Sequence, residues 1–408
     1  MHQEPQINPS LENMQAACAA AGHPERAYSI IQITGTNGKT STARIIEQLL
    51  IAEGLKTGLY TSPSLICDTE RIRVGGNDIS ASDLAAAKEA ARVAATSIDL
   101  QLTAFEEMTL AMFIHFQQSG VDFAVVEVGM GGRWDATSAA HPAVAVITAV
   151  GLDHQEFLGD THEEIAFDKA HIIKPGASVV LGRSLFSQHE PHIADIFINR
   201  AKGFGLHPRS VTDDVLKVID SAPLKTEFAV TTLHANYSDL HLPAASYQAS
   251  NAATAIMAAE AALGRALDTS LVRTTLSQLT FPGRFEVIRK EPLLIFDGSH
   301  NPAAAHMLAR QIASLTEGQL AGEKPIIALG ILNDKDAKGI IAALAPVAAG
   351  FIVLEPASSR AIPAAQLAKL ITEVTGQAPS NQQIETIRQP LIITGSLSLY
   401  PLLQSFSM

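Results

Sequence analysis

The fold of this chain is decided around one stretch, Ile33-Thr34-Gly35-Thr36-Asn37-Gly38-Lys39-Thr40-Ser41-Thr42. It follows an apolar run that predicts a strand, and it opens a pattern that predicts a helix. In that context glycines let backbone N–H groups converge on phosphate oxygens, a lysine adds charge, and a hydroxyl faces Mg²⁺. The general phosphate-loop pattern has glycine where Ile33 stands, so a glycine-rich turn without a ligand is the alternative. The nucleotide-binding residues expected here are Gly35, Thr36, Asn37, Gly38, Lys39, Thr40 and Ser41.

Short β-branched runs alternate with longer helical patterns on both sides of this stretch. Such alternation predicts an α/β fold with a mostly parallel sheet and helices on both faces. The expected strands are Ser29–Thr34, Lys56–Tyr60, Phe123–Val128, Ala143–Ala149 and Ala177–Leu181, and the expected helices are Thr42–Glu53, Ala81–Thr96 and Glu106–Ser119.

The turn signal Phe281-Pro282-Gly283-Arg284 precedes a second alternation of strands and helices. We therefore expect a large phosphate-loop ATP-binding domain over residues 1–280 and a smaller Rossmann-like α/β domain over residues 281–408. Residues 184–242 show no regular pattern, and a helix is expected over Ser250–Leu263. The second domain is expected to hold strands Leu293–Phe296, Pro325–Leu329, Gly350–Leu354 and Pro390–Ile393 with helices Pro302–Leu315, Asp336–Leu344 and Pro363–Val374.

Composition excludes several classes of protein. The net charge of −12 disfavours general nucleic-acid binding, which needs a basic face. The two cysteines, Cys18 and Cys67, have no metal-ligand spacing and provide no disulfide framework. No apolar run approaches the ~20 residues of a membrane span, and Met1-His2-Gln3-Glu4-Pro5 lacks the basic start of a signal peptide. We expect a reduced, cytoplasmic monomer without nucleic-acid or membrane partners.

The spacing Gly-Thr-Asn-Gly-Lys resembles the Mur ligase superfamily, and further segments resemble its folylpolyglutamate synthase and dihydrofolate synthase family. They follow the family order from residue 33 to residue 336, with a weaker match at Thr394–Leu397. Thr40, Ser64, Ser138 and His171 depart from the family's usual Gly, His, Asn and Gly. The matching segments are Tyr60–Pro63, Glu70–Ile72, Thr103–Glu106, Glu127–Thr137, Gly151–His154, Lys169-Ala170 with Ile172–Lys174, Asn251–Ala253, Pro282–Arg284, Asp297–Pro302 and Asp334–Asp336.

This resemblance implies an ATP-dependent amide ligase that activates a carboxylate as an acyl phosphate. The carboxylate would belong to dihydropteroate or be the γ-carboxyl of a (tetrahydro)folate, and the acceptor would be L-glutamate. The implied cofactors are ATP and two Mg²⁺ ions, one held by Ser62 and Glu127 and the second by His154. The implied catalytic residues are Lys39, His154, Lys169 and His300.

The local sequence also bears on two of these residues. Glu127 follows the apolar run Phe123–Val126 beside a glycine cluster, and carboxylate oxygens suit Mg²⁺; a solvated strand-end glutamate is the alternative. Lys169 by its local sequence would be a solvated helix residue. The resemblance reverses that interpretation, because the family's lysine at this position is carbamylated, which turns a cation into an anion.

The resemblance also assigns the remaining site residues. Asn251, Arg284 and Asp297 match ATP-binding positions, although Asn251 could merely cap the start of a helix. His300 and Ser396 match positions associated with the incoming glutamate. The pterin pocket is matched by Phe105, Arg133, Trp134 and Asp135, and Trp134, the only tryptophan, could stack on a flat ring or serve only as a core or surface aromatic.

Three alternatives remain open. A Mur-type ligase of cell-wall precursors is favoured by Thr40 and disfavoured by Glu70-Arg71-Ile72. A non-catalytic nucleotide-binding relative is expected to lack at least one of Lys39, Glu127, His154 and Lys169, and all four are present. A simple ATPase would release phosphate without an amino acid. The stretch Asn8–Asn13 resembles the family's dihydropteroate-binding segment only faintly, so it does not separate dihydrofolate synthase from folylpolyglutamate synthase.

Overall fold

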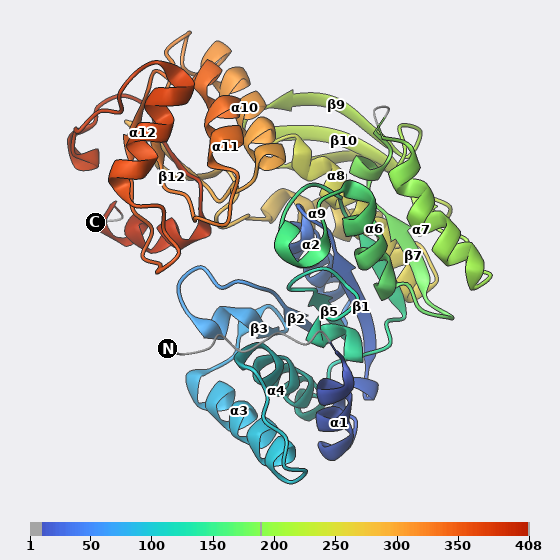
Figure 1. The fold of residues 1–408 in the computed structure, drawn as a ribbon. Coiled ribbons are helices and arrows are strands. Elements are labelled where there is room, and N and C mark those ends of the chain that lie inside the picture. Colours follow the sequence, from blue (N-terminus) through green and yellow to red (C-terminus); the bar gives the residue numbers. More distant parts are fainter. Residues whose placement is uncertain (1–9, 188–189, 407–408) are drawn as a thin grey trace.

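The structure is a computed structural model that describes residues 10–187 and 190–406 (Figure 1). Met1–Pro5 and Asn8-Pro9, considered above, lie outside these residues. Within the described residues, no helix is both long enough and apolar enough to cross a membrane. Cys18 is buried and Cys67 is exposed, and both are free thiols.

A sheet of eight strands organises the first half of the chain, in the order β4-β3-β2-β5-β1-β6-β7-β8. Its strands from β2 to β8 in that order pair in parallel, whereas β3 pairs antiparallel with both β2 and β4. All five strands predicted in this region are present, with slightly shifted ends. The strands are β1 (Ser29–Thr34), β2 (Thr57–Tyr60), β3 (Ile72–Val74), β4 (Asn77–Asp78), β5 (Phe123–Glu127), β6 (Val144–Ile147), β7 (Ser178–Leu181) and β8 (Arg209–Ser210).

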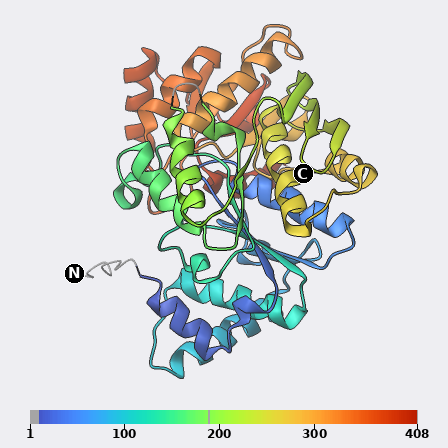
Figure 2. The ribbon, with the colours of Figure 1, turned by 90° about the vertical axis from the view of Figure 1, so that its right-hand side faces the viewer.

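Helices cover both faces of this sheet because its strands are apolar on both sides. Ile31 and Ile33 face the core with α2, α8 and α9, whereas Ile30 faces the core with α1, α3 and α4 (Figures 1 and 2). The helices of this region are α1 (Glu12–Ala20), α2 (Lys39–Ala52), α3 (Ala81–Thr96), α4 (Ala104–Ser119), α5 (Gln155–Leu158), α6 (His162–Lys169), α7 (His192–Gly203), α8 (Tyr247–Leu263) and α9 (Thr269–Gln278).

The region without a predicted pattern contains α7 and a three-stranded antiparallel sheet. Its strands are β9 (Leu216–Ala222), β10 (Lys225–Thr231) and β11 (Asn236–Leu242), with β10 in the middle. Only Thr226, Phe228 and Val230 of β10 are buried, and they alternate with Lys225, Glu227, Ala229 and Thr231. Bulges shift the register of both pairings. The polar faces and broken register hide these strands from a search for apolar runs.

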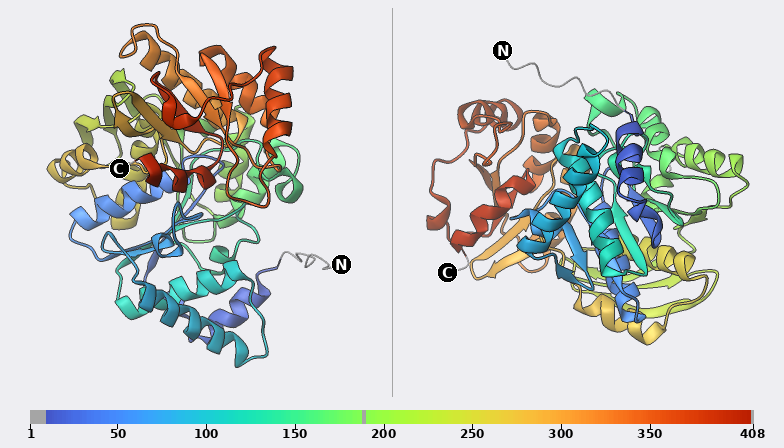
Figure 3. Two further views of the ribbon diagram at one scale, coloured as in Figure 1. Left: turned by 90° about the vertical axis from the view of Figure 1, so that its left-hand side faces the viewer. Right: turned by 90° about the horizontal axis from the view of Figure 1, so that it is seen from below.

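A five-stranded sheet in the order β12-β13-β16-β14-β15 organises the last third of the chain. The second alternation predicted four of these strands and all three helices; the missed strand is the antiparallel edge strand β12. The predicted boundary at 280 falls between α9 and β12, and the division into two domains stays a prediction. The elements are β12 (Glu286–Lys290), β13 (Leu293–Asp297), β14 (Ile326–Leu329), β15 (Gly350–Val353), β16 (Leu391–Thr394), α10 (Pro302–Glu317), α11 (Ala337–Leu344) and α12 (Ala364–Thr375) (Figure 3).

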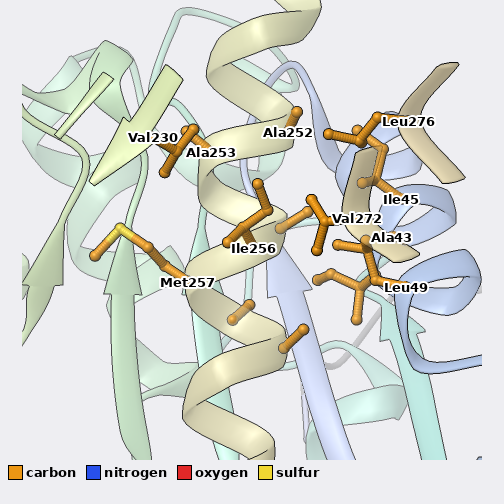
Figure 4. Packing of buried hydrophobic residues seen from close by; sticks show 14 of the residues in the cluster. Ala43, Ile45, Leu49, Val230, Ala252, Ala253, Ile256, Met257, Val272 and Leu276 are labelled. Atoms are coloured by element: carbon orange, nitrogen blue, oxygen red, sulfur yellow. The ribbon is translucent and has the colours of Figure 1, made fainter. Parts of the chain in front are cut away.

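The core around α8 generates a stability prediction. Ile256 of α8 is fully buried, in one hydrophobic cluster with Leu49 of α2 and Val272 of α9 (Figure 4). Ile256→Ala is expected to lower the free energy of unfolding by about 2–5 kcal/mol, because it leaves a cavity where α8 packs. A urea unfolding curve measures the change. Ile98→Ala, at a residue that is 44% exposed, is the control, and equal shifts for the two variants would contradict the packing argument.

Candidate active site

Two glycines allow the loop between β1 and α2 to pass close to neighbouring backbone. Gly38 caps α2 with φ 86°, a conformation that favours glycine. A Cβ atom on Gly35 would lie 2.0 Å from Thr148 Oγ1, so no side chain fits there. Lys39, the first residue of α2, donates from Nζ to Gly35 O at 2.7 Å. The loop thus places a helix N-terminus and a lysine at the carboxyl end of β1, as an anion site requires.

The loop is held against the end of β6 and against α8. Thr148 Oγ1 donates to Asn37 O at 2.6 Å, and Thr36 N donates to Ala149 O at 2.9 Å. Gln248 Nε2 of α8 donates to Ser41 Oγ at 3.2 Å. These bonds fix the loop from two elements distant in sequence.

Asn251 occupies a different helix position from the one expected. The helix was predicted to begin at Ser250, but α8 begins at Tyr247, so Asn251 lies in its second turn. Its Nδ2 donates to Gln248 Oε1 at 2.7 Å, within the helix, and does not cap it. The side chain also lines the cleft beside Gly38.

Glu127 ends β5 with a carboxylate that is only partly satisfied. The residue is 1% exposed, and Oε1 accepts a hydrogen bond from Thr40 Oγ1 at 3.0 Å. Oε2 is buried and has no hydrogen-bond partner among the described residues. Burial raises the pKa of Glu127, and the charge of Lys39 and the Thr40 hydrogen bond oppose this shift. An unpaired buried carboxylate oxygen is costly unless a ligand engages it.

These donors fit a divalent cation such as Mg²⁺. Ser62 and Glu127 line the same cleft and offer only oxygen atoms. Among the described residues, no group of three or more His, Cys, Asp or Glu side chains is arranged to hold a metal. Mg²⁺ in proteins is usually held by one or two carboxylates, and substrate phosphates and water complete its coordination.

Lys169 is buried, at 4% exposed, where α6 ends. Its ammonium group makes no hydrogen bond or ion pair with any described residue. Burial, reinforced by the charge of Lys39, lowers the pKa of Lys169 to about 7. Lys169 is therefore not the solvated helix residue that its local sequence predicts.

His154 lines the cleft from the loop after β6, with φ 54°. Desolvation lowers its pKa to about 4; Asp153 opposes the shift, and the charges of Lys335, Lys39 and Lys169 reinforce it. The imidazole is therefore neutral at pH 7 and has a lone pair available to a metal.

Asp153 is the residue of this site to which sequence reasoning gave no role. Its Oδ1 lies 2.6 Å from Lys335 Nζ and its Oδ2 lies 3.5 Å from His300 Nε2. Burial by itself raises its pKa, but His300, His154 and Lys335 hold it well below the usual value. Its place directly before His154 at a strand end was the available signal.

One cleft of about 430 Å³ lies between the two large sheets. Apolar side chains that were not predicted, among them Tyr247, Met307 and Leu397, form part of its wall. Every predicted nucleotide, metal and catalytic residue lines it, namely Gly35, Thr36, Asn37, Gly38, Lys39, Thr40, Ser41, Ser62, Glu127, His154, Lys169, Asn251, Arg284, Asp297 and His300.

Asp297 reaches this cleft from the end of β13, but both of its carboxylate oxygens already accept backbone hydrogen bonds. Phe285 N donates to Oδ2 at 2.8 Å and Ser299 N donates to Oδ1 at 2.9 Å. Asp297 therefore fixes the loops that carry Arg284 and His300 around the cleft.

The predicted pterin pocket and Ser396 do not line this cleft. Asp135 accepts hydrogen bonds from Met130 N and Thr137 N, both at 3.0 Å, and so shapes its own loop. Trp134 is 42% exposed and lies 4.5 Å under the guanidinium of Arg133. Phe105 packs beside Tyr60, with ring centroids 6.5 Å apart. Ser396 is buried and accepts a hydrogen bond from Ser398 N. Their substrate roles stay predictions.

Comparison with known protein families identifies the class. Residues 33–259 match the Mur ligase middle domain, and residues 283–392 match the glutamate ligase domain of the Mur ligases. The chain is 35% identical over 394 residues to the dihydrofolate synthase/folylpolyglutamate synthase of Mycobacterium tuberculosis, covering 90% of this chain and 78% of that one. It is 33% identical over 341 residues to the Escherichia coli enzyme of the same name, covering 84% and 76%.

Solved structures agree with these matches. Mycobacterium tuberculosis folylpolyglutamate synthase with ADP and AMPPCP superposes with a TM-score of 0.88 at 31% identity, over 98% of this chain and 95% of that one. E. coli FolC with DHPP and ADP gives 0.84 at 28%, over 99% and 94%. A bifunctional folylpolyglutamate synthase/dihydrofolate synthase with Mn, AMPPNP and L-glutamate gives 0.84 at 28%, over 100% and 95%.

The chain thus has the fold of the Mur ligases. Within that superfamily it belongs to the dihydrofolate synthase/folylpolyglutamate synthase family. Membership makes it an ATP-dependent glutamate ligase of folates.

The phosphate loop generates a prediction about Lys39. Lys39→Ala is expected to reduce ligation by at least about a hundredfold, because a charge aimed at transferring phosphate is typically worth several kcal/mol. Steady-state ADP release measures this. The thermal unfolding midpoint is expected to stay near that of the wild type. More than about a tenth of wild-type turnover in the variant would refute the role.

Proposed function

We propose that this chain joins L-glutamate to dihydropteroate, to the γ-carboxyl of a (tetrahydro)folate, or to both, through an acyl phosphate. The observation that supports this most is the unpaired Oε2 of Glu127 beside the phosphate loop. A buried carboxylate oxygen at that place suits a cation shared with nucleotide phosphates. A monomeric state stays a prediction. A cytoplasmic location stays a prediction.

The chemistry takes two steps. The substrate carboxylate attacks the γ-phosphate of ATP, ADP leaves, and the acyl phosphate forms. The α-amine of L-glutamate then attacks the acyl carbon, loses a proton, and expels phosphate as the amide forms. Lys39 and Arg284 offset charge on the phosphates, and Asn251 and Asp297 hold the nucleotide. Ser62 and Glu127 would hold one Mg²⁺ ion and His154 a second, and the two ions would neutralise further charge on the phosphates.

The surroundings of Lys169 support its carbamylation. An amine adds CO₂ only in its neutral form, and a pKa of about 7 leaves a large neutral fraction at neutral pH. The product carries a negative charge in a cleft where Lys39 already lies near enough to shift the pKa of Lys169. The carbamate would therefore replace a repulsive pair of cations with an attractive pair.

The carbamate prediction is tested with ¹³C-labelled CO₂. A carbamate resonance is expected in the wild type and not in Lys169→Ala. Its intensity is expected to rise with pH through about 7, because the neutral amine is the form that reacts. Lys174→Ala is the control for other lysines of lowered pKa. A wild type with no resonance would refute the modification, and a fully active Lys169→Ala would refute its role in ligation.

The bound molecules of the two solved relatives support the substrate assignment. DHPP is bound in the E. coli structure, and L-glutamate is bound in the structure with Mn and AMPPNP. Thr40, which made the loop resemble the cell-wall ligases, bonds to Glu127 and contributes to the metal side of the cleft. It therefore does not argue for a UDP-muramyl substrate.

Substrate choice is tested by glutamate-dependent ADP release. We expect it with dihydropteroate or a reduced folate, and not with a UDP-muramyl compound. Trp134→Ala is expected to weaken pterin binding by about 1–3 kcal/mol, the range for a base stacked on an aromatic ring, and to leave ATP affinity nearly unchanged. Isothermal titration calorimetry measures both affinities in the wild type and in the variant, and quenching of the single tryptophan gives an independent pterin binding curve for the wild type. Equal losses for both ligands would make Trp134 structural, and activity with the cell-wall precursor alone would overturn the folate assignment.

A further inference from the structure

Asp153 receives every ion pair that joins the residues before 280 to those after it in the part of the chain that the structure describes. Its two partners are Lys335 Nζ at 2.6 Å and His300 Nε2 at 3.5 Å. Asn301 Nδ2 adds a hydrogen bond at 3.4 Å. The side chains of Lys335 and Asp153 are only 7% and 6% exposed. The electrostatic contact between the two parts of the chain is therefore concentrated on one buried carboxylate.

Hydrogen bonds connect the Asp153 carboxylate to His154 and, through Asn301, to the phosphate loop. His154 N donates to Asp153 Oδ1 at 3.0 Å, so the anchor and the candidate metal residue share one turn. Asn301, which contacts Asp153, also exchanges side-chain amide hydrogen bonds with Asn37 of the phosphate loop, at 3.2 and 3.4 Å. The position of the C-terminal sheet at Asp153 therefore affects the positions of both the His154 turn and the phosphate loop.

A buried ion pair such as Asp153–Lys335 is stabilising only when its two side chains are in contact. Removing two charges from water costs several kcal/mol, and their mutual attraction offsets this cost only when the geometry is good. If Lys335 moves away, Asp153 either remains buried without its partner or the cleft opens to water. The pair therefore favours one relative placement of the two parts, with Lys335 on the C-terminal side and Asp153 on the nucleotide side.

We propose that Lys335 is a positioning residue that latches the C-terminal part onto Asp153 and keeps water from the acyl phosphate. The inference rests on the function proposed above. With the latch closed, the amine of glutamate attacks the acyl carbon, loses a proton and expels phosphate. With the latch open, water attacks the same carbon, loses a proton, expels phosphate and regenerates the carboxylate. Both routes release phosphate, and only the first makes an amide.

The ratio of phosphate released to amide formed tests this latch. The wild type is expected to release about one phosphate per amide, because a closed site prevents hydrolysis. Lys335→Met, which removes the charge and keeps the length, is expected to raise this ratio severalfold. It is also expected to slow amide formation by about tenfold to a hundredfold, the scale of small misplacements, with ADP affinity within about twofold of wild type. Lys335→Arg is expected to restore much of the coupling.

Lys338→Met is the matched control. Lys338 lies three residues further on, in α11, and is 62% exposed in an ion pair with Glu373 at 3.2 Å. This variant is expected to behave like the wild type. In addition, Asp153→Asn combined with Lys335→Met is expected to lose no more than the worse single variant, since both changes open one latch.

The outcomes are distinguishable. An active Lys335→Met enzyme that still releases one phosphate per amide refutes the latch. Parallel loss of ADP affinity, thermal stability and rate also refutes it, since Lys335 would then be structural. A wild-type enzyme that forms no amide from folate and glutamate refutes the proposed function itself.

Discussion

Parallel pairing of β1 with β5 on one side and β6 on the other is the constraint on which this site depends. Ile33 lies opposite Glu127, and Thr34 lies opposite Ile147, so the three strands end at one edge of the sheet. Neighbouring strands lie about 4.8 Å apart, so groups that follow these strands meet without help from long loops. The phosphate loop, the Glu127 carboxylate and the Asp153-His154 turn occupy one small volume for this reason.

The site places ionisable groups where water is scarce, which a purely structural interior avoids. Burial raises the pKa of Glu127 and lowers that of Lys39 and Lys169. Each shift disfavours the charged form of its residue. Polyanionic phosphates would favour the charged lysines, and cations would favour the charged carboxylate. Asp153 is the opposite case, since its partners keep it ionised and hold it in place. The buried ionisable groups of the site are therefore of two kinds. Glu127, Lys39 and Lys169 are suited to contact ligands, whereas Asp153 holds neighbouring side chains in place.

The sequence was sufficient to predict the layers of helices and strands and the candidate site residues that follow parallel strands. Parallel strands carry continuous apolar runs, and the residues that follow them are placed by the topology, which is why Lys39 and Glu127 could be assigned. The polar antiparallel strand β10 gave no such run, and α8 began before its predicted start. Lys335 could not have been paired with Asp153, because 182 residues separate them and no periodicity reports how two sheets dock.

Hydrogen bonds at the end of β13 connect the nucleotide-contacting residues of the C-terminal part to the orientation of its sheet. Gly298 N donates to Gly283 O at 2.9 Å, and Phe285 N donates to Asp297 Oδ2 at 2.8 Å. The turn that carries Arg284 is therefore tied to the end of β13 and cannot move independently of it. Since Arg284 and Asp297 both line the cleft, a nucleotide held by them fixes the orientation of the C-terminal sheet. In that orientation the loop of His300 and Asn301 contacts Asp153, which places the C-terminal contacts of the nucleotide and the buried carboxylate on the same side of the cleft.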